Sequence, residues 1–266
     1  MVLNEIVERK RKEIEGLKRR FPLSKISRMA EKLNEPKRSL HKSLTTKKRI
    51  HLICELKKAS PSEGILRKSF KPKTLAQEFE VVGASAISVL TERHYFKGDP
   101  KTLKLIRPVT TIPLLRKDFI LNPYQIYETA LLGADAFLLI VTLLTDSELK
   151  EMLKLAHSLK LDVLVEIHTK EELDRALSAE SKIIGINNRN LKTLQVDRSV
   201  SEKLICFIPK GVVTVIESGI ETREEIIHYQ TLGAHCFLIG TALMKSTNVK
   251  ETISKLCGQS NGVAQW

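Results

Sequence analysis

The sequence predicts an α/β fold, a closed (β/α)8 TIM barrel preceded by an N-terminal helical extension. From residue 50 onward, short runs rich in Val, Ile and Leu alternate with longer amphipathic stretches, the pattern of parallel strands joined by helices. There are eight such runs, and their starts lie about 26 residues apart, which suits one strand, one helix and two short loops. Eight consecutive βα units favour a closed barrel, although strand counting alone also allows an open, doubly wound sheet.

The 49 residues before the first apolar run are expected to be an extension of the barrel. They contain a charged, helix-like stretch from about Leu3 to Arg20 and a less regular one from Leu23 to Leu44. We expect residues 1–49 to pack on the barrel, residues 50–256 to form it, and residues 257–266, which have few apolar side chains, to fray as a C-terminal tail.

Each strand and several helix ends carry local signals. The strands are expected to begin near His51, Ala86, Ile112, Ala136, Asp162, Ile183, Val212 and Cys236. Glycine suits the C-terminal cap of a helix, and a Gly-Ala pair follows three helical stretches, at Gly83, Gly133 and Gly233. N-terminal cap signals stand at Asn122-Pro123, at Thr145-Asp146 before a helix expected over 147–159, and at Thr222 with Glu225 as a capping box.

The net charge of +13 is concentrated at one end of the chain. Residues 1–49 hold 16 Lys and Arg against 6 Asp and Glu, a net +10, which leaves +3 for residues 50–266. The basic segment could indicate a nucleic-acid-binding protein, but it has one aromatic residue, Phe21, and its charges interleave with Glu, which favours a solvated helical face. No apolar run reaches the roughly 18 residues that a membrane span needs. We expect a cytoplasmic protein without a secretory signal.

The cysteines and histidines do not form a metal-binding pattern. Cys54, Cys206, Cys236 and Cys257 lack metal-ligand spacing, and structural disulfides are not expected. His51 and His168 have no metal-binding partner in the sequence and are expected to be structural. No metal is assigned.

Charged and amide side chains stand at the predicted ends of strands that are otherwise apolar. They are Glu55, Lys57, Lys117, Glu166, Asn187, Arg189 and Glu217. Glu55 and Lys57 are two apart on the first strand, as are Asn187 and Arg189 on the sixth, so each pair shares one face. Any one of these side chains could reach solvent at the end of its strand. Five Glu and Lys side chains that converge in one place must instead form ion pairs with one another or take part in catalysis. Mixed charges of this kind suit general acid and base catalysis.

Small residues follow the last two predicted strands, at Ser218-Gly219 and Gly240-Thr241. Barrel enzymes commonly bind phosphate at these two loops, where small residues let main-chain N–H groups reach the phosphate oxygens. The sequence therefore predicts a phosphate site beside the charged cluster.

Five segments closely resemble the indole-3-glycerol phosphate synthase family of tryptophan biosynthesis. They are ELKKASPSEG at 55–64, LLRKDFILNPYQIYE at 114–128, LVEIH at 164–168, IGINNRNLKTLQVD at 184–197 and IESGI at 216–220. The similarity runs in order from about residue 50 to 245, and the N-terminal extension also resembles the family's extra helices. The resemblance implies ring closure, decarboxylation and dehydration of 1-(o-carboxyphenylamino)-1-deoxyribulose 5-phosphate, without a cofactor.

The resemblance also implies a role for each site residue. Lys117 corresponds to the general acid of ring closure, and Glu166, Lys57 and Glu55 to the acid–base residues of the later steps, whose order stays open. Asn187 and Glu217 resemble residues that hold the substrate hydroxyls and the lysines. The phosphate site would comprise Lys57, Ser60, Ser218, Gly219, Gly240 and Thr241, and the walls around the aromatic ring Ser60, Pro61, Phe96, Phe119 and Arg189. The implied partner is a small sugar phosphate, bound by a monomer with no nucleic acid or membrane.

Some positions depart from the family pattern. An acidic residue is usual near Ser69 and Lys71, Lys is common at Glu63, Glu or Ser at Thr241, and Asp at Asn122. The nearest alternative is phosphoribosylanthranilate isomerase, another phosphate-binding barrel of the same pathway. It would be expected to use a Cys and an Asp, but Cys54 alternates with Glu55 and should point away from the barrel interior.

Overall fold

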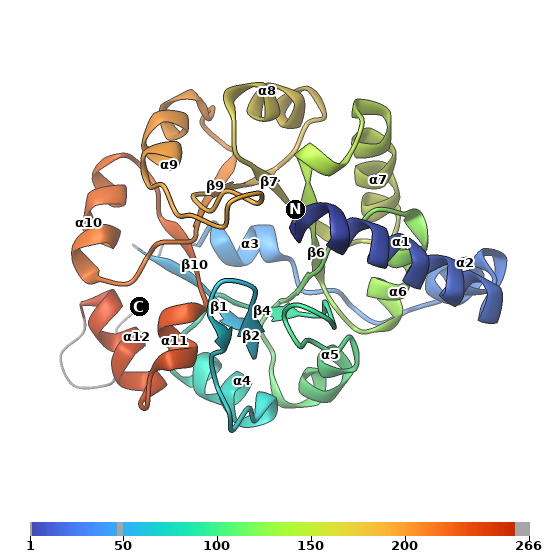
Figure 1. Cartoon of the computed structure of the whole chain (residues 1–266), viewed down its shortest axis with the longest axis horizontal. Helices are drawn as coiled ribbons and strands as arrows, with labels where there is room; N and C mark the ends of the chain where they lie inside the picture. Colours follow the sequence, from blue (N-terminus) through green and yellow to red (C-terminus); the bar gives the residue numbers. More distant parts are fainter. Residues whose placement is uncertain (1, 47–49, 259–266) are drawn as a thin grey trace.

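Residues 2–46 and 50–258 are described by a computed structural model, in which eight parallel strands close into a barrel (Figure 1). The closing pair is β1 with β10, in the register His51↔Cys236, and this excludes the open sheet. The barrel strands are β1 His51–Leu56, β4 Ala86–Leu90, β5 Leu114–Lys117, β6 Ala136–Ile140, β7 Asp162–Ile167, β8 Ile183–Asn187, β9 Val213–Glu217 and β10 Cys236–Ile239.

The strands lie where the sequence predicts, with small differences at their ends. β5 begins at Leu114 rather than Ile112, because Pro113 between them has no N–H to give to a neighbouring strand. Lys57 and Arg189 follow β1 and β8 instead of lying on them. A short hairpin that the sequence did not predict pairs β2 Ala59–Ser60 with β3 Gly64–Ile65.

Helices surround the barrel in the expected alternation. They are α4 Pro72–Val81, α5 Lys101–Ile106, α6 Pro123–Leu131, α7 Asp146–Ser158, α8 Lys170–Ser178, α9 Ser199–Leu204, α10 Arg223–Thr231, α11 Thr241–Lys245 and α12 Val249–Cys257, with 3-10 turns at Arg107–Val109, Val141–Leu143 and Ile205–Phe207. The predicted capping box at Thr222 and Glu225 is present, and Asn122 caps α6. Gly83, Gly133 and Gly233 adopt the positive φ of a C-terminal cap.

Alternation along the strands separates two apolar layers. On β7, Val163, Val165 and Ile167 pack outward against the helices, whereas Leu164 belongs to the core inside the barrel. The next inward position on the same strand is Glu166. Because side chains alternate with a period of two, β1, β5, β7, β8 and β9 carry apolar residues in their lower part and a charged or amide side chain near their carboxyl end. Cys54 packs outward, as predicted.

The N-terminal helices lie at both ends of the barrel. They are α1 Val2–Arg20, α2 Leu23–Glu31 and α3 Leu40–Leu44. In Figure 1, α1 starts over the centre of the barrel and runs outward to α2, which packs on α6. α3 lies at the opposite end, where Ser39 donates a hydrogen bond to Asp162 at the start of β7. Residues 259–266, most of the expected tail, lie outside the described residues.

The cysteines and the helices bear on two further expectations from the sequence. Cys54, Cys206, Cys236 and Cys257, which all lie in the described part of the chain, form no disulfide with one another. Among the described helices, none combines the length and the apolar character needed to cross a membrane.

Candidate active site

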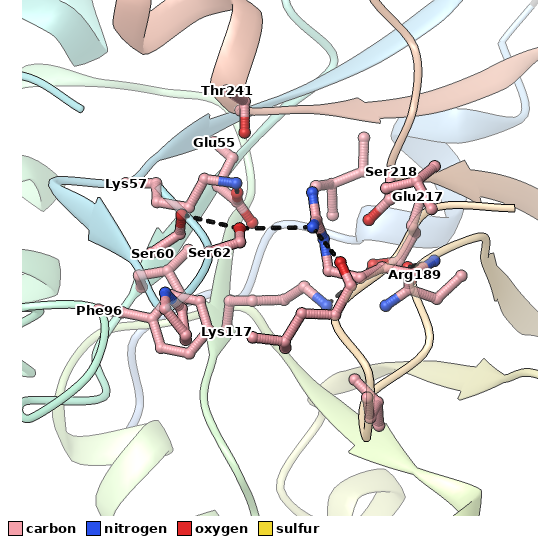
Figure 2. Close-up of a pocket in the computed structure, with 18 of the residues that line it drawn as sticks. Glu55, Lys57, Ser60, Ser62, Phe96, Lys117, Arg189, Glu217, Ser218 and Thr241 are labelled. Atoms are coloured by element: carbon pink, nitrogen blue, oxygen red, sulfur yellow. Dashed lines mark hydrogen bonds and ion pairs between the residues drawn. The ribbon is translucent and has the colours of Figure 1, made fainter. Parts of the chain in front are cut away.

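A cavity of about 240 Å³ lies at the carboxyl ends of the strands (Figure 2). Every residue that the sequence assigns to catalysis, substrate binding or phosphate binding lines it: Glu55, Lys57, Ser60, Pro61, Phe96, Lys117, Phe119, Glu166, Asn187, Arg189, Glu217, Ser218, Gly219, Gly240 and Thr241. Residues from strands that are far apart in the sequence meet here because parallel strands end at the same rim of the barrel.

Lys117 occupies the centre of the charged cluster. Its Nζ lies 2.7 Å from Oε2 of Glu166 and 2.8 Å from Oε2 of Glu217, and both carboxylates are almost fully buried. A second ion pair joins Lys57 Nζ to Glu55 Oε1 at 2.9 Å. The three Glu and two Lys that the sequence places at strand ends thus converge and are mutually paired, so that no single charge is buried alone.

The surroundings separate the protonation states of these groups. Burial by itself lowers the pKa of Lys117, but Glu166, Glu217 and Glu55 outweigh it and hold the pKa above its usual value. Burial raises the pKa of Glu217 to about 7, with repulsion from Glu166 acting in the same direction and Lys117 opposing it. For Glu166 burial also favours the neutral acid, yet Lys117 and His168 bring the pKa below its usual value. Near neutral pH Lys117 is therefore an ammonium, Glu166 a carboxylate and Glu217 a carboxyl group that exchanges its proton.

Two phenylalanines form an aromatic wall beside Lys117. The rings of Phe96 and Phe119 are tilted by 43° with centroids 6.4 Å apart. Phe96 lies on the loop after β4, and this loop is held by the buried carboxylate of Glu92, which accepts the main-chain N–H groups of His94, Tyr95 and Phe96 at 2.7–3.0 Å. A flat apolar ring would be held here by tilted aromatic contacts.

Arg189 joins two loops at the mouth of the cavity. Its Nη1 donates to the main-chain oxygen of Leu194 at 2.7 Å and to Oγ of Ser62 in the turn between β2 and β3 at 3.4 Å. Ser62 is in turn 3.4 Å from Ser60. Figure 2 draws these contacts as dashed lines that run from Ser60 through Ser62 to Arg189.

The turn after β9 has an unusual backbone. Ser218 and Gly219 have φ values of +66° and +78°, a conformation that disfavours most side chains. Gly240 follows β10, and a Cβ there would lie 2.3 Å from Oε1 of Glu55. Glycine at this position leaves room for the carboxylate of Glu55 and exposes main-chain N–H groups beside it.

Gly185, in the middle of β8, is a residue that the sequence analysis missed. A Cβ at Gly185 would lie 2.0 Å from Oε1 of Glu217 and 3.2 Å from Cδ1 of Leu164. The missing side chain makes space for the carboxylate that contacts Lys117. Glycine inside the apolar run IIGIN was the available signal, since glycine in a strand often marks a close approach.

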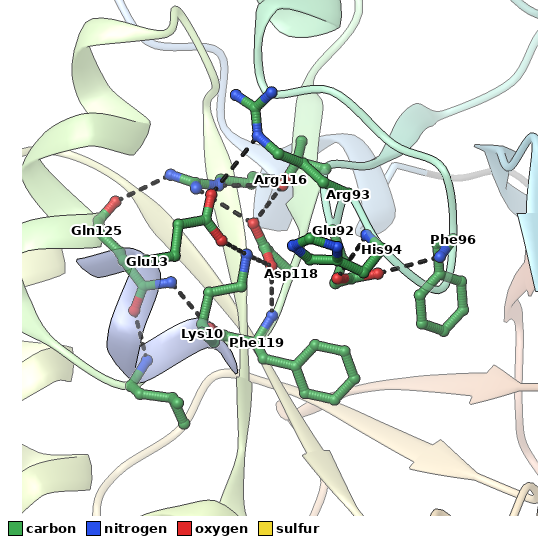
Figure 3. A network of polar contacts seen from close by, with 12 residues as sticks. Lys10, Glu13, Glu92, Arg93, His94, Phe96, Arg116, Asp118, Phe119 and Gln125 are labelled. Carbon is green, nitrogen blue, oxygen red and sulfur yellow. Dashed lines mark hydrogen bonds and ion pairs between the residues drawn. The ribbon is translucent and has the colours of Figure 1, made fainter. Parts of the chain in front are cut away.

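The first helix also contributes to the cavity, which the charge pattern did not reveal. Leu3 and Ile6 of α1 line it. The helix is held by Lys10, whose Nζ lies 3.0 Å from Oδ1 of Asp118, and the two side chains are 4% and 0% exposed (Figure 3). Asp118 stands between Lys117 and Phe119, so one buried ion pair connects the extension to the site.

Asp118 is surrounded by donors on its other side as well. Its Oδ2 accepts from Oγ1 of Thr91 at 2.6 Å and from Nη2 of Arg116 at 3.2 Å, and Arg116 is paired with Glu128 at 2.7 Å. Burial alone would raise the pKa of Asp118, but Lys10 and Arg116 bring it below its usual value. The network in Figure 3 thus holds a carboxylate next to Lys117.

Comparison with known proteins matches residues 3–256 to the family model of indole-3-glycerol phosphate synthase. The chain is 44% identical over 262 residues to an indole-3-glycerol phosphate synthase of Carboxydothermus hydrogenoformans, covering 96% of this chain and 99% of that protein. It is 43% identical over 257 residues to one of Campylobacter jejuni, covering 96% of this chain and all of its relative.

Solved structures share the fold at low identity. KGPDC from Streptococcus mutans has a TM-score of 0.61 and 13% identity, covering 79% of this chain and 97% of that one. Thiamine phosphate pyrophosphorylase from Pyrococcus furiosus has a TM-score of 0.59 and 14% identity, with 83% and 96% covered. These neighbours support the barrel fold, and the sequence relatives exclude the isomerase alternative. The chain belongs to the indole-3-glycerol phosphate synthase family, carboxy-lyases of tryptophan biosynthesis that act on a small phosphorylated substrate.

Proposed function

We propose that Lys117 is the general acid of the ring-closing step. The observation that carries the proposal is its position between two buried carboxylates, 2.7 and 2.8 Å away, which keep it an ammonium. In this step an aromatic carbon of 1-(o-carboxyphenylamino)-1-deoxyribulose 5-phosphate forms a bond to the ribulose carbonyl carbon. The carbonyl oxygen gains negative charge, which an adjacent ammonium stabilises and then protonates. A developing alkoxide is basic enough to take a proton even from a lysine with a raised pKa.

In the remaining steps, decarboxylation and dehydration, the side chains of the enzyme have only to transfer protons. The ring carbon that forms the new bond also bears the carboxylate, so loss of CO2 from it restores the aromatic ring. Loss of the new hydroxyl as water then completes the indole. We assign Glu166, Lys57 and Glu55 to these proton transfers without fixing their order, and Asn187 and Glu217 to holding the substrate hydroxyls and the lysines. Because its pKa is about 7, Glu217 can be protonated or ionised near neutral pH, and so could either donate or accept a proton.

The aromatic ring and the phosphate of the substrate are assigned to two groups of residues, which share Ser60. Ser60, Pro61, Phe96, Phe119 and Arg189 would enclose the anthranilate ring. The phosphate would bind at the residues that follow the last two strands, with help from the first loop: Lys57, Ser60, Ser218, Gly219, Gly240 and Thr241. Anchoring the two ends of the substrate supplies the orientation that brings the ring carbon against the carbonyl.

The experiment that tests the residue roles combines indole fluorescence with rapid quenching. Wild-type protein mixed with the substrate should release fluorescent indole product. A variant that lacks the acid for dehydration should accumulate the ring-closed, decarboxylated intermediate, whereas a Lys117 variant should accumulate nothing, since ring closure comes first. Accumulation of a ring-closed species by a Lys117 variant would remove Lys117 from the first step.

Gly185→Ala is expected to lower kcat by about 10- to 100-fold while the protein still folds. The new methyl group would displace the carboxylate of Glu217 from Lys117, since the two atoms would otherwise be 2.0 Å apart, and small displacements at a reacting centre are costly. Steady-state kinetics with circular dichroism checks this. Gly16→Ala is the matched control, because nothing lies within 4 Å of a Cβ at Gly16. Wild-type kcat in Gly185→Ala would show that Glu217 does not need this space.

Inorganic phosphate is expected to raise KM and leave kcat unchanged. It should occupy the site at Gly219 and Gly240 and compete with the phosphate of the substrate. Initial rates at several phosphate concentrations, with chloride at equal ionic strength as the control, measure the effect. Inhibition that lowers kcat, or that chloride reproduces, would argue against a phosphate site in these loops.

We further propose the division into an extension (1–49), a barrel (50–256) and a tail (257–266), and a cytoplasmic monomer without nucleic-acid or membrane partners. The burial of Lys10 against Asp118 speaks against the nucleic-acid alternative, because one of the basic residues of the extension serves an internal contact. Light scattering would test the monomer, and a salt titration of duplex-DNA binding would test the nucleic-acid alternative.

A further inference from the structure

His168 has a contact that its sequence context did not indicate. It follows β7, two residues beyond Glu166, so both side chains leave the chain on the same side. Nε2 of His168 lies 3.5 Å from Oε1 of Glu166. Within the described part of the chain, neither of these two buried atoms has a hydrogen-bond partner. Glu166 thus faces Lys117 with Oε2 and His168 with Oε1.

A second carboxylate holds the imidazole from the other side. Glu172, in the first turn of α8, lies with Oε2 3.4 Å from Nδ1 of His168 and accepts the main-chain N–H of the same residue at 2.6 Å. Thr169 caps α8 and accepts from the N–H of Glu172, which fixes this turn. His168 is therefore positioned by a helix terminus outside the cavity and directed at a residue that lines it.

The charges around the ring favour the imidazolium. The groups that face it are Glu166 on β7, Glu172 on α8 and, farther away, Glu217 on β9, while Lys117 on β5 is paired with Glu166. Burial by itself would lower the pKa of His168, but these carboxylates outweigh burial and raise it above its usual value. In return, the imidazolium helps Lys117 to keep the buried Glu166 ionised.

We propose that His168, held by Glu172, is a positioning residue that keeps Glu166 ionised and aligned with Lys117. The inference rests on the proposed role of Glu166 in proton transfer. His168 acts through Glu166 and needs no contact with the substrate. Its effect is expected to be present while the imidazole is protonated and to fade as pH rises through the raised pKa of His168.

The test compares His168→Ala, His168→Gln and Glu172→Gln with wild type in kcat and KM between pH 4 and 9. His168→Ala should lower kcat by about 10- to 100-fold with KM within about twofold, because the catalytic carboxylate is misplaced and less readily ionised. The acid limb of the kcat profile should move to higher pH in both His168 variants, whereas in Glu172→Gln the effect of His168 should fade at a lower pH than in wild type, because Glu172 helps to raise the pKa of His168. His168→Gln, which keeps a donor but no charge, should recover part of kcat and keep the displaced limb.

Controls separate this inference from the proposed function. His228→Ala should behave as wild type, because His228 pairs with Glu202 at 2.8 Å among exposed residues of α9 and α10. Far-UV circular dichroism and thermal melting verify the fold. If Glu166→Gln is inactive while the His168 variants keep the kcat of wild type and the acid limb of its pH profile, the proposed positioning role of His168 is wrong. If Glu166→Gln itself retains wild-type kcat, the proposed role of Glu166 has failed instead.

Discussion

Lys117→Ala is expected to reduce kcat by at least about 10³-fold, because the variant loses both the proton donor and the positive charge at the developing alkoxide. Glu166 and Glu217 would also lose their shared cation, 2.7 and 2.8 Å from them. Two buried carboxylates without a cation take up protons, so the pKa of both should rise and the substrate would meet two neutral carboxyl groups in their place. Stopped-flow indole fluorescence, with product analysis after quenching, measures the loss.

Lys117→Arg distinguishes proton donation from charge. Arginine keeps the ion pairs with the two carboxylates, so the variant should melt close to wild type, but it gives up a proton far less readily than lysine. We expect kcat to fall by about 10²-fold or more in this variant. Lys170→Ala is the control, since Lys170 is paired with Asp174 on the exposed face of α8. Turnover near the wild-type rate in a folded Lys117→Ala protein would overturn the assignment of the acid.

Asp118→Ala is expected to destabilise the fold by about 3–5 kcal/mol, the cost of removing one partner from a buried ion pair. Asp118 accepts from Lys10 on one side and from Arg116 on the other, and its side chain is fully buried. Losing it leaves two cations in the interior with one carboxylate each, Glu13 for Lys10 and Glu128 for Arg116. Urea unfolding followed by circular dichroism gives the change in the midpoint.

The difference in unfolding free energy between wild type and Asp118→Ala should become smaller as pH falls. The pKa of Asp118 is lower in the folded protein than in an unfolded chain, so its stabilisation is present above the unfolded value of about 4 and is lost as pH falls through the folded value. Wild type and Asp118→Ala should therefore differ most near neutral pH and converge in acid. A difference that grows as pH falls would contradict the ion-pair explanation.

Two further variants make this result specific. Asp174→Ala breaks an exposed pair with Lys170 and should cost no more than about 1 kcal/mol. Lys10→Met combined with Asp118→Ala should be less destabilised than the sum of the single changes, because the double variant no longer buries the unpaired lysine. A purely additive result would mean that Lys10 and Asp118 do not stabilise each other.

Much of the fold could be predicted because its signals are local. Strand positions follow from apolar runs, and helix ends from caps such as Asn122, from Thr222 with Glu225, and from Gly133. The site residues could be located for a related reason: parallel strands end at the same rim, so a polar residue that ends an apolar strand, such as Glu166 or Glu217, must lie near its counterparts. The family resemblance added the reaction and the roles, which spacing alone does not provide.

Contacts between distant segments were decided only by the tertiary structure. The sequence by itself determined the order of βα units, the polar residues at the strand ends and the helical character of the extension. It did not determine that the barrel closes between β1 and β10, that Lys10 pairs with Asp118, that Gly185 makes room for Glu217, or that His168 faces Glu166. The alternation of side chains along a strand and the capping of a helix depend on residues only a few positions apart, so the sequence reveals them. The pairings above join residues far apart in the sequence. They depend on how the closed barrel and the packed helices bring those side chains together, which no local sequence pattern encodes.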